Sequence, residues 1–240
     1  MNRFFGHRQG AEAFLSAPDA HHLLNVLRMK VGEKIEVADD GDLFLCSIQA
    51  TDPLKIKIDE KIECHSELPS DLCLAFSLLK NGHDELVLQK GTELGVRRFI
   101  PFVSKRSIIK LDEKGKKKKL ERYEKIVEGA ASQSKRLFIP EVSPILIYDD
   151  VLKAEADHRY IAYEELSKGD SSLLSELSKI KGGEKTICLI GPEGGFEGKE
   201  VEKAKEAGFL PISLGKRILR AETASIYFAS VFSLIVEARK

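Results

Sequence analysis

The C-terminal segment constrains the fold of this chain more than any other stretch. Its residue pattern predicts a final helix at Glu222–Ala238 whose apolar residues leave almost no polar face. A helix that is apolar all round must be buried on all sides. The segment is too short for a membrane span, which needs roughly 20 apolar residues. We therefore expect the core to cover one side of this helix and a second copy of the chain to cover the rest.

Upstream of this helix, strand-like apolar runs alternate with amphipathic helices. Such alternation predicts a mostly parallel sheet with helices on both faces. The predicted strands are Leu72–Leu79, Arg98–Val103, Tyr160–Tyr163, Ile187–Ile190 and Pro211–Leu214. The predicted helices are Asp84–Leu94 (with Gly95 as its C-terminal cap), Lys116–Ser134, Asp149–Ala156, Ser172–Ile180 and Lys199–Ala207.

The first 70 residues have a different residue pattern, in which turns separate short β-like runs. One helix, which begins at Pro18-Asp19, interrupts them and presents an apolar face of Leu23, Leu24, Val26 and Leu27. The predicted strands are Lys34–Ala38, Leu43–Ala50 and Lys55–Ile62. We predict a small β-barrel domain at 1–70 and an α/β domain at 71–240, joined by a linker at Glu67–Ser70.

Composition excludes several protein classes. The apolar content of 42% and the charged content of 32% are typical of a soluble globular protein. We find neither a membrane-length apolar run nor the apolar core of a signal peptide. The cysteines at 46, 64, 73 and 188 lack CxxC spacing, which favours reduced thiols over a disulfide framework or a zinc site. We expect a cytoplasmic protein without a metal centre.

Basic charge is concentrated in the middle of the chain, although the net charge is zero. Residues 71–140 carry 16 basic and 9 acidic side chains. A concentration of this kind suits binding of a phosphate backbone, but a solvated charged surface is the alternative interpretation.

A glycine-rich loop, Gly191–Phe196, follows the predicted strand at Ile187–Ile190. Ligands of α/β sheets bind beyond the carboxyl ends of strands, and glycines allow close approach of the backbone. A phosphate-binding P-loop is excluded because Glu193 and Glu200 occupy positions that it requires as Gly and Ser or Thr. No GxGxxG motif follows a strand. The loop taken alone leaves open a ligand site or a turn without a ligand.

A second loop, Gly215–Arg220, leads directly into the buried helix through Ala221–Ala224. Charged side chains beside an apolar helix are costly to bury unpaired, so Arg220 and Glu222 are expected to be paired or functional. The alternative is that Glu222 or Thr223 caps the helix N-terminus.

These loops resemble the signature of the RsmE family, which are 16S (small-subunit) ribosomal RNA uridine-N3 methyltransferases of the SPOUT class. The resemblance covers the whole chain, with Gly91 in place of the more usual Ala and Lys105 in place of an acidic residue. The matching segments are Arg3–Phe5, His22–Arg28, Gln89–Val96, Ser104–Ser107, Ala130–Arg136, Ile190–Phe196 and Leu214–Ala224.

The resemblance implies a C-terminal α/β domain with a deep trefoil knot and an N-terminal PUA-like barrel that assists RNA binding. It also implies a homodimer through the last helix. S-adenosyl-L-methionine is the implied cofactor. The implied substrate is 16S ribosomal RNA within the small ribosomal subunit.

The resemblance also implies roles for individual residues. Arg220 would stabilise or orient the uracil anion, while Glu93 and Glu222 would each be a general base or a member of a structural ion pair with a nearby Arg. The implied cofactor-binding residues are Leu189, Ile190, Gly191, Pro192, Glu193, Gly194, Gly195, Leu214, Gly215, Ile218, Leu219, Arg220, Thr223 and Ala224. The implied RNA-binding residues are Arg3, Arg8, Arg28, Lys80, Arg97, Arg98, Lys105, Arg106, Gln133, Lys135 and Arg136.

Two other functions are compatible with these motifs. One is a knotted methyltransferase that acts on transfer RNA or on a ribose hydroxyl. The other is a ribosome-assembly factor that keeps the fold and has lost turnover.

Overall fold

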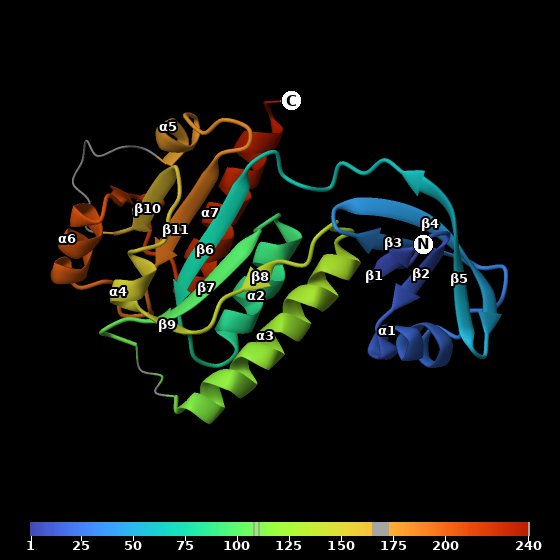
Figure 1. Cartoon of the computed structure of the whole chain (residues 1–240). Coiled ribbons are helices and arrows are strands. Elements are labelled where there is room, and N and C mark those ends of the chain that lie inside the picture. Colours follow the sequence, from blue (N-terminus) through green and yellow to red (C-terminus); the bar gives the residue numbers. More distant parts are fainter. Residues whose placement is uncertain (108, 110, 165–172, 240) are drawn as a thin grey trace. The chain divides into compact units, whose positions relative to one another are not determined.

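A computed structural model of the chain describes residues 1–107, 109, 111–164 and 173–239 (Figure 1). Its contacts divide the chain into two compact units. The first comprises residues 1–67 and 131–139, and the second comprises residues 68–130 and 140–240. The inclusion of residues 131–139 in the first unit depends on contacts between distant parts of the chain, which sequence order does not show.

The first unit is a closed five-stranded barrel, as the sequence predicts. Its strands follow the order β1-β2-β5-β4-β3, and parallel pairing of β1 with β3 closes the ring. The sequence pattern missed β1 and β2, which alternate less clearly than the other strands. The strands are β1 (Arg3–Gln9), β2 (Glu12–Leu15), β3 (Lys34–Asp39), β4 (Asp42–Thr51) and β5 (Leu54–Ile62).

The helical segment of the barrel differs from its prediction. The α-helix α1 (Ala17–His21) continues as a π-helix, η1 (His22–Val26), in which the N–H of Leu27 bonds to the carbonyl of His22. Leu23 is fully buried, but Val26 is 60% exposed. Of the predicted apolar face, Leu23 is therefore buried in the barrel core, whereas Val26 and Leu27 are exposed to solvent.

The second unit is built on a parallel sheet, which confirms the predicted architecture. Its strand order is β12-β10-β11-β6-β7-β8, with β9 also paired to β7, and neighbouring strands pair in parallel within the described residues. The strands are β6 (Asp71–Ser77), β7 (Arg98–Val103), β8 (Glu141–Val142), β9 (Leu146–Ile147), β10 (His158–Ala162), β11 (Lys185–Ile190) and β12 (Leu210–Ile212).

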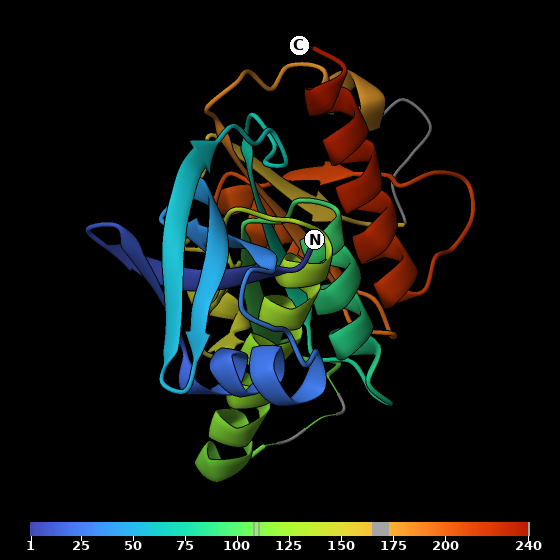
Figure 2. The same ribbon diagram turned by 90° about the vertical axis from the view of Figure 1, so that its right-hand side faces the viewer.

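Helices cover both faces of this sheet because successive strand residues point to opposite sides. On one face, Leu74 and Phe76 belong to a core cluster with Phe228. On the other face, Ala75 belongs to a cluster with Val201. Figure 2 shows α2 and α7 side by side. The helices are α2 (His83–Glu93), α3 (Glu113–Gln133), α4 (Tyr148–Val151), α5 (Leu173–Leu177), α6 (Gly198–Glu206) and α7 (Ala221–Glu237).

Most predicted boundaries agree with these elements, and Gly95 follows the last helical residues of α2 with a φ of 91°. The helix predicted at Asp149–Ala156 is shorter, since α4 ends at Val151. Ser172, where another predicted helix begins, lies outside the described residues.

Helix α7 is only partly covered by its own chain. Phe228 and Phe232 are fully buried, whereas Tyr227 is 40% and Leu234 is 68% exposed. Complete burial of α7 by a second copy of the chain therefore stays a prediction. The trefoil knot also stays a prediction. Within the described ranges, no helix combines the length and the apolar character needed to cross a bilayer.

Candidate functional site

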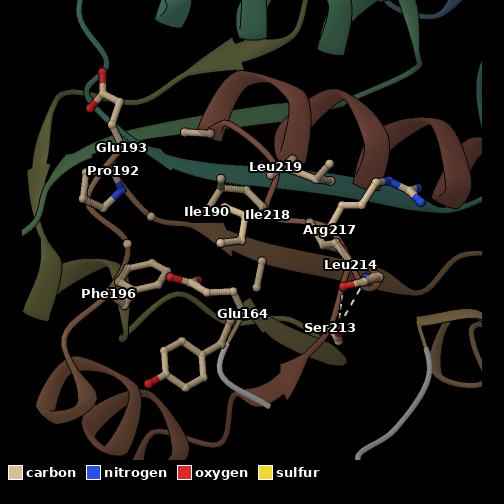
Figure 3. Close-up of a pocket in the computed structure, with 17 residues that line it drawn as sticks. Glu164, Ile190, Pro192, Glu193, Phe196, Ser213, Leu214, Arg217, Ile218 and Leu219 are labelled. Atoms are coloured by element: carbon tan, nitrogen blue, oxygen red, sulfur yellow. Dashed lines mark hydrogen bonds between the residues drawn. The ribbon is translucent and has the colours of Figure 1, made fainter. Parts of the chain in front are cut away.

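A pocket lies where β10, β11 and β12 end, at the carboxyl edge of the parallel sheet (Figure 3). Segments that follow these three strands, together with the start of α7, form its wall. The lining residues are Ala162, Tyr163, Glu164, Ile190, Gly191, Pro192, Glu193, Gly195, Phe196, Ser213, Leu214, Gly215, Arg217, Ile218, Leu219, Ala221 and Ala224.

The loop after β11 is anchored by an aromatic side chain. Phe196 is buried, and its ring stacks on that of Phe102 with 6.4 Å between centroids. A β-carbon at Gly191 would lie 3.1 Å from the Phe196 ring, so glycine lets the backbone pass close to this anchor. The N–H of Gly195 donates to the carbonyl of Pro192 over 2.9 Å and closes the turn. The loop therefore presents its backbone to the pocket in a fixed turn.

Charged contacts connect this loop and the start of α6 to the segment after β7. Lys105 Nζ lies 2.8 Å from a carboxylate oxygen of Glu197, and this ion pair lowers the pKa of the Glu197 carboxyl. The backbone N–H of Lys105 donates to the buried Glu200 over 3.0 Å. Arg106 Nη1 donates to the carbonyl oxygen of Gly194 over 2.8 Å. The segment at 104–107 therefore positions the glycine-rich loop.

Hydroxyl groups of two buried serines and one half-buried serine hold the same segment in place. Ser77 Oγ, at the end of β6, lies 2.6 Å from Ser107 Oγ and 3.2 Å from Ser104 Oγ. After β6, the N–H of Lys80 donates to Glu193 over 3.1 Å. Loops from several strand ends thus hold one another in place around the pocket.

The loop after β12 offers unpaired backbone donors. Within the described chain, the backbone N–H groups of residues 216–219 make no hydrogen bond. The Ile218 side chain is 88% exposed at the pocket rim. Three of these residues, Arg217, Ile218 and Leu219, line the pocket, and an unpartnered backbone amide at a pocket wall can bind the polar edge of a ligand.

The two charged residues at the start of α7, Arg220 and Glu222, have different surroundings. Arg220 is the exposed N-cap residue, and no side chain caps the helix. Glu222 is buried, and its Oε1 lies 3.3 Å from Nδ1 of His83 in α2. In the described part of the chain, Glu222 Oε2 has no hydrogen-bond partner. Glu222 is therefore paired with His83, as one of the two alternatives expected. Neither Glu222 nor Thr223 caps the N-terminus of α7.

Comparisons with known proteins indicate the same family over most of the chain. Residues 66–233 match the family described as RNA methyltransferase domain, and residues 15–61 match the RNA methyltransferase PUA domain. A Bacillus subtilis protein named ribosomal RNA small subunit methyltransferase E is 38% identical over 93% of this chain and 90% of its own length. The chain belongs to the ribosomal RNA small subunit methyltransferase E family. It is therefore an RNA methyltransferase by family.

Solved structures with the same fold extend this similarity. A structure of this family member from Neisseria gonorrhoeae, bound to S-adenosyl methionine, has a TM-score of 0.85 and 28% identity over 98% of each chain. A methyltransferase from Legionella pneumophila in complex with the same cofactor has a TM-score of 0.86 and 30% identity, over 98% of this chain and 97% of that one.

The pocket brings together most of the predicted cofactor-binding residues. Four of them do not line it, namely Leu189, Gly194, Arg220 and Thr223. Sequence reasoning missed the lining residues Ala162, Tyr163, Glu164, Phe196, Ser213, Arg217 and Ala221. A signal existed for Tyr163 and Glu164, since they stand at the end of a predicted strand, where ligands of parallel sheets bind.

Glu93 lies outside the pocket wall. Both of its carboxylate oxygens accept hydrogen bonds from Lys90 Nζ, at 2.9 and 3.0 Å, one turn earlier in α2. Of its two predicted roles, the geometry favours the structural ion pair, although the partner is Lys90 and not the expected Arg.

Two predicted RNA-binding residues need correction. Arg3 is buried and pairs with Glu36 over 2.9 Å, and Arg136 is 2% exposed and pairs with Glu67 over 2.7 Å. Neither guanidinium is accessible to RNA, so we remove both from the RNA-binding set. Arg97 and Lys135 are half-buried. The exposed members of the predicted set are Arg8, Arg28, Lys80, Arg98, Lys105, Arg106 and Gln133.

Proposed function

We propose that this protein transfers a methyl group from S-adenosyl-L-methionine to N3 of a uridine in 16S ribosomal RNA. One observation carries the proposal. A chain that matches the RNA methyltransferase family from residue 66 to 233 forms its pocket from a glycine loop and from a second loop with unpaired amides.

The residues present fit this cofactor. Adenine needs an apolar surface and backbone hydrogen bonds. Ile190, Leu214 and Leu219 supply the apolar surface, and the unpartnered amides at 217–219 can supply the hydrogen bonds. Gly191 and Gly195 let the loop backbone pass close to Phe196 and Glu164 at the pocket wall, because a β-carbon at either position would meet that neighbouring side chain. The cofactor, when bound, supplies a methyl group activated by a sulfonium.

Uridine N3 carries a proton at neutral pH, so the chain must help to remove it or stabilise the resulting anion. Arg220 is exposed at the start of α7, directly after the loop that lines the pocket. Its guanidinium would hold the negative uracil and orient N3 toward the methyl group. Arg220 does not line the pocket, so we propose that it contacts the RNA base and not the cofactor.

Glu222 is the remaining candidate for a general base. Its buried carboxylate lies between the lining residues Ala221 and Ala224 in sequence, but it faces His83 and does not itself line the pocket. We propose that Glu222 mainly holds the N-terminal turn of α7 against α2 through its contact with His83. Any proton transfer by Glu222 would require access from the pocket.

The wider assembly follows from the same proposal. The target base would be unpaired or flipped out, while exposed basic residues contact phosphates. The partly exposed face of α7, with Tyr227 and Leu234, would be the homodimer interface. We propose that the enzyme acts in the cytoplasm on the small ribosomal subunit, and that its α/β domain carries the trefoil knot.

Two measurements test the proposed function. Mass spectrometry of nucleosides from 16S ribosomal RNA should lack N3-methyluridine in a deletion strain and recover it on complementation. Its persistence would overturn the assignment, and loss of a ribose or transfer RNA methylation instead would favour another knotted methyltransferase. Calorimetry should show binding of S-adenosylmethionine. Absence of binding would favour a non-catalytic assembly factor.

A further inference from the structure

Glu164 lies directly against the backbone of Gly195. A β-carbon at Gly195 would stand only 2.6 Å from Oε1 of Glu164 and 3.7 Å from Oε2. Gly195 also has a φ of 67°, which other residues rarely adopt. This position therefore requires glycine for two reasons, and one of them is the neighbouring carboxylate. Figure 3 shows the Glu164 side chain reaching from the end of β10 toward the loop that carries Phe196.

The carboxylate of Glu164 has no partner among the described residues. The other acidic side chain of the pocket, Glu193, already accepts a hydrogen bond from the N–H of Lys80. The basic residue of the pocket wall, Arg217, is directed away from Glu164 in Figure 3. An ionised carboxylate can only accept hydrogen bonds, so Glu164 offers its oxygens to donors of a ligand.

A nucleoside cofactor brings two kinds of donor, the vicinal hydroxyls of its ribose and the ammonium of its amino-acid tail. The ammonium shares a carbon atom with a carboxylate, which would bring a like charge beside Glu164. The two hydroxyls carry no charge, and their spacing matches the two oxygens of one carboxylate. A carboxylate that binds ribose hydroxyls is also a recurring device at the carboxyl edge of parallel sheets.

We propose that Glu164 accepts hydrogen bonds from both ribose hydroxyls of the cofactor and so makes the pocket selective for a ribonucleoside. This inference rests on the proposed function, because it assigns a subsite of the same pocket. Gly195 serves the subsite by leaving the carboxylate room beside the loop.

Calorimetry with S-adenosylhomocysteine, its 2′-deoxy analogue and 5′-methylthioadenosine tests the subsite. The wild type should lose about 10- to 100-fold in affinity for the deoxy analogue, the range expected for a hydrogen bond to a charged group. Glu164→Gln should bind S-adenosylhomocysteine about 10-fold or more weakly and should discriminate less between the two. The loss should persist with 5′-methylthioadenosine, which has the ribose but lacks the amino-acid tail.

Glu193→Gln is the matched control, since it removes the same charge from the same pocket. It should retain the wild-type preference for the ribose compound, and melting curves of both variants show whether the fold is intact. Unchanged discrimination in Glu164→Gln would overturn the proposal. A loss of affinity confined to ligands with the amino-acid tail would also overturn it, because that result would show that Glu164 binds the ammonium of the tail. If the wild type binds none of the three compounds, the proposed function fails first.

Discussion

Arg106 Nη1 lies 2.8 Å from the carbonyl oxygen of Gly194 and donates a hydrogen bond to it. The contact joins the segment after β7 to the glycine-rich loop after β11. The sequence associated Arg106 with RNA, whereas this contact gives it a role in shaping the pocket that we propose for the cofactor. The guanidinium is half-exposed, so the two roles are compatible and can be measured separately.

Arg106→Ala is expected to weaken binding of S-adenosylhomocysteine about 2- to 10-fold, because the loop loses one hydrogen bond that holds its shape. Calorimetry without RNA measures this effect alone. Lys199→Ala on α6 removes the same charge from an exposed position outside the pocket wall and should leave the affinity unchanged. Equal affinities for Arg106→Ala and the wild type would restrict Arg106 to RNA binding.

Gly195→Ala should weaken cofactor binding by more than about 10-fold and destabilise the protein by about 1 kcal/mol or more. The φ of 67° is unfavourable for alanine, and its β-carbon would collide with Glu164. Gly194→Ala is the control, since its β-carbon would meet Arg106 at an ordinary 3.6 Å. Calorimetry and thermal melting measure both variants. Similar behaviour of the two variants would contradict the crowding at Gly195.

Arg220→Ala should reduce methyl transfer about 100- to 1,000-fold, as loss of a charge-stabilising donor does, while cofactor affinity stays nearly unchanged. The reason is that Arg220 is exposed and does not line the pocket. Single-turnover transfer to 16S ribosomal RNA and calorimetry separate the two effects. Lys216→Ala, on the same loop, controls for charge. A parallel loss of cofactor affinity would make Arg220 a cofactor-binding or structural residue.

Arg136→Ala should destabilise the protein by about 3 kcal/mol, because it breaks a nearly buried ion pair and leaves Glu67 without its cation. Urea denaturation followed by circular dichroism measures the change. Lys117→Ala, an exposed substitution in α3, should change stability by less than about 0.5 kcal/mol. Reduced RNA affinity at unchanged stability would restore Arg136 to the RNA-binding set.

Cys64 should be the first thiol to react with iodoacetamide as the pH rises. Burial opposes its ionisation, but hydrogen bonds from Ser66 and Arg3 lower the pKa of the Cys64 thiol below its usual value. Burial raises the pKa of Cys46 to about 11 and that of Cys73 to about 12, and it also raises the pKa of Cys188. A thiol with a lower pKa forms the reactive thiolate at a lower pH.

Peptide mass spectrometry after brief alkylation between pH 6 and about 8.5 gives the order of labelling, since an ordinary thiol ionises near the upper end of this range. Labelling of the buried Cys188 as fast as Cys64 would contradict the prediction. Arg3→Ala should slow labelling of Cys64 at a given pH if the fold is retained, because the stabilising guanidinium is gone.

Local patterns predicted many elements of the second unit, because the signals involved act over a few residues. Arg98–Val103 is a strand with the predicted bounds, and Gly95 ends α2 as its positive φ allows. At His22–Val26 the pattern predicted an α-helix, but the chain forms a π-helix. A π turn and an α turn share the same apolar residues but direct them differently, so periodicity could not distinguish them.

The candidate site was predicted in part for the same reason. Gly191 and Gly195 stand out because a glycine-rich loop after a strand is a short motif, and the resemblance to a family named the cofactor. Ala162, Glu164 and Ser213 belong to neither loop motif, and only the fold brings them to the same pocket as those loops.

The sequence by itself determined the alternation of strands and helices, the apolar last helix and the loops that carry the family signature. These depend on residue type and spacing along the chain. The tertiary structure alone decided that Glu164 meets Gly195, that Glu222 meets His83 and that Arg136 is buried against Glu67. Each of these contacts joins residues far apart in sequence. Strand order and core packing, and not local propensity, determine which of them come together.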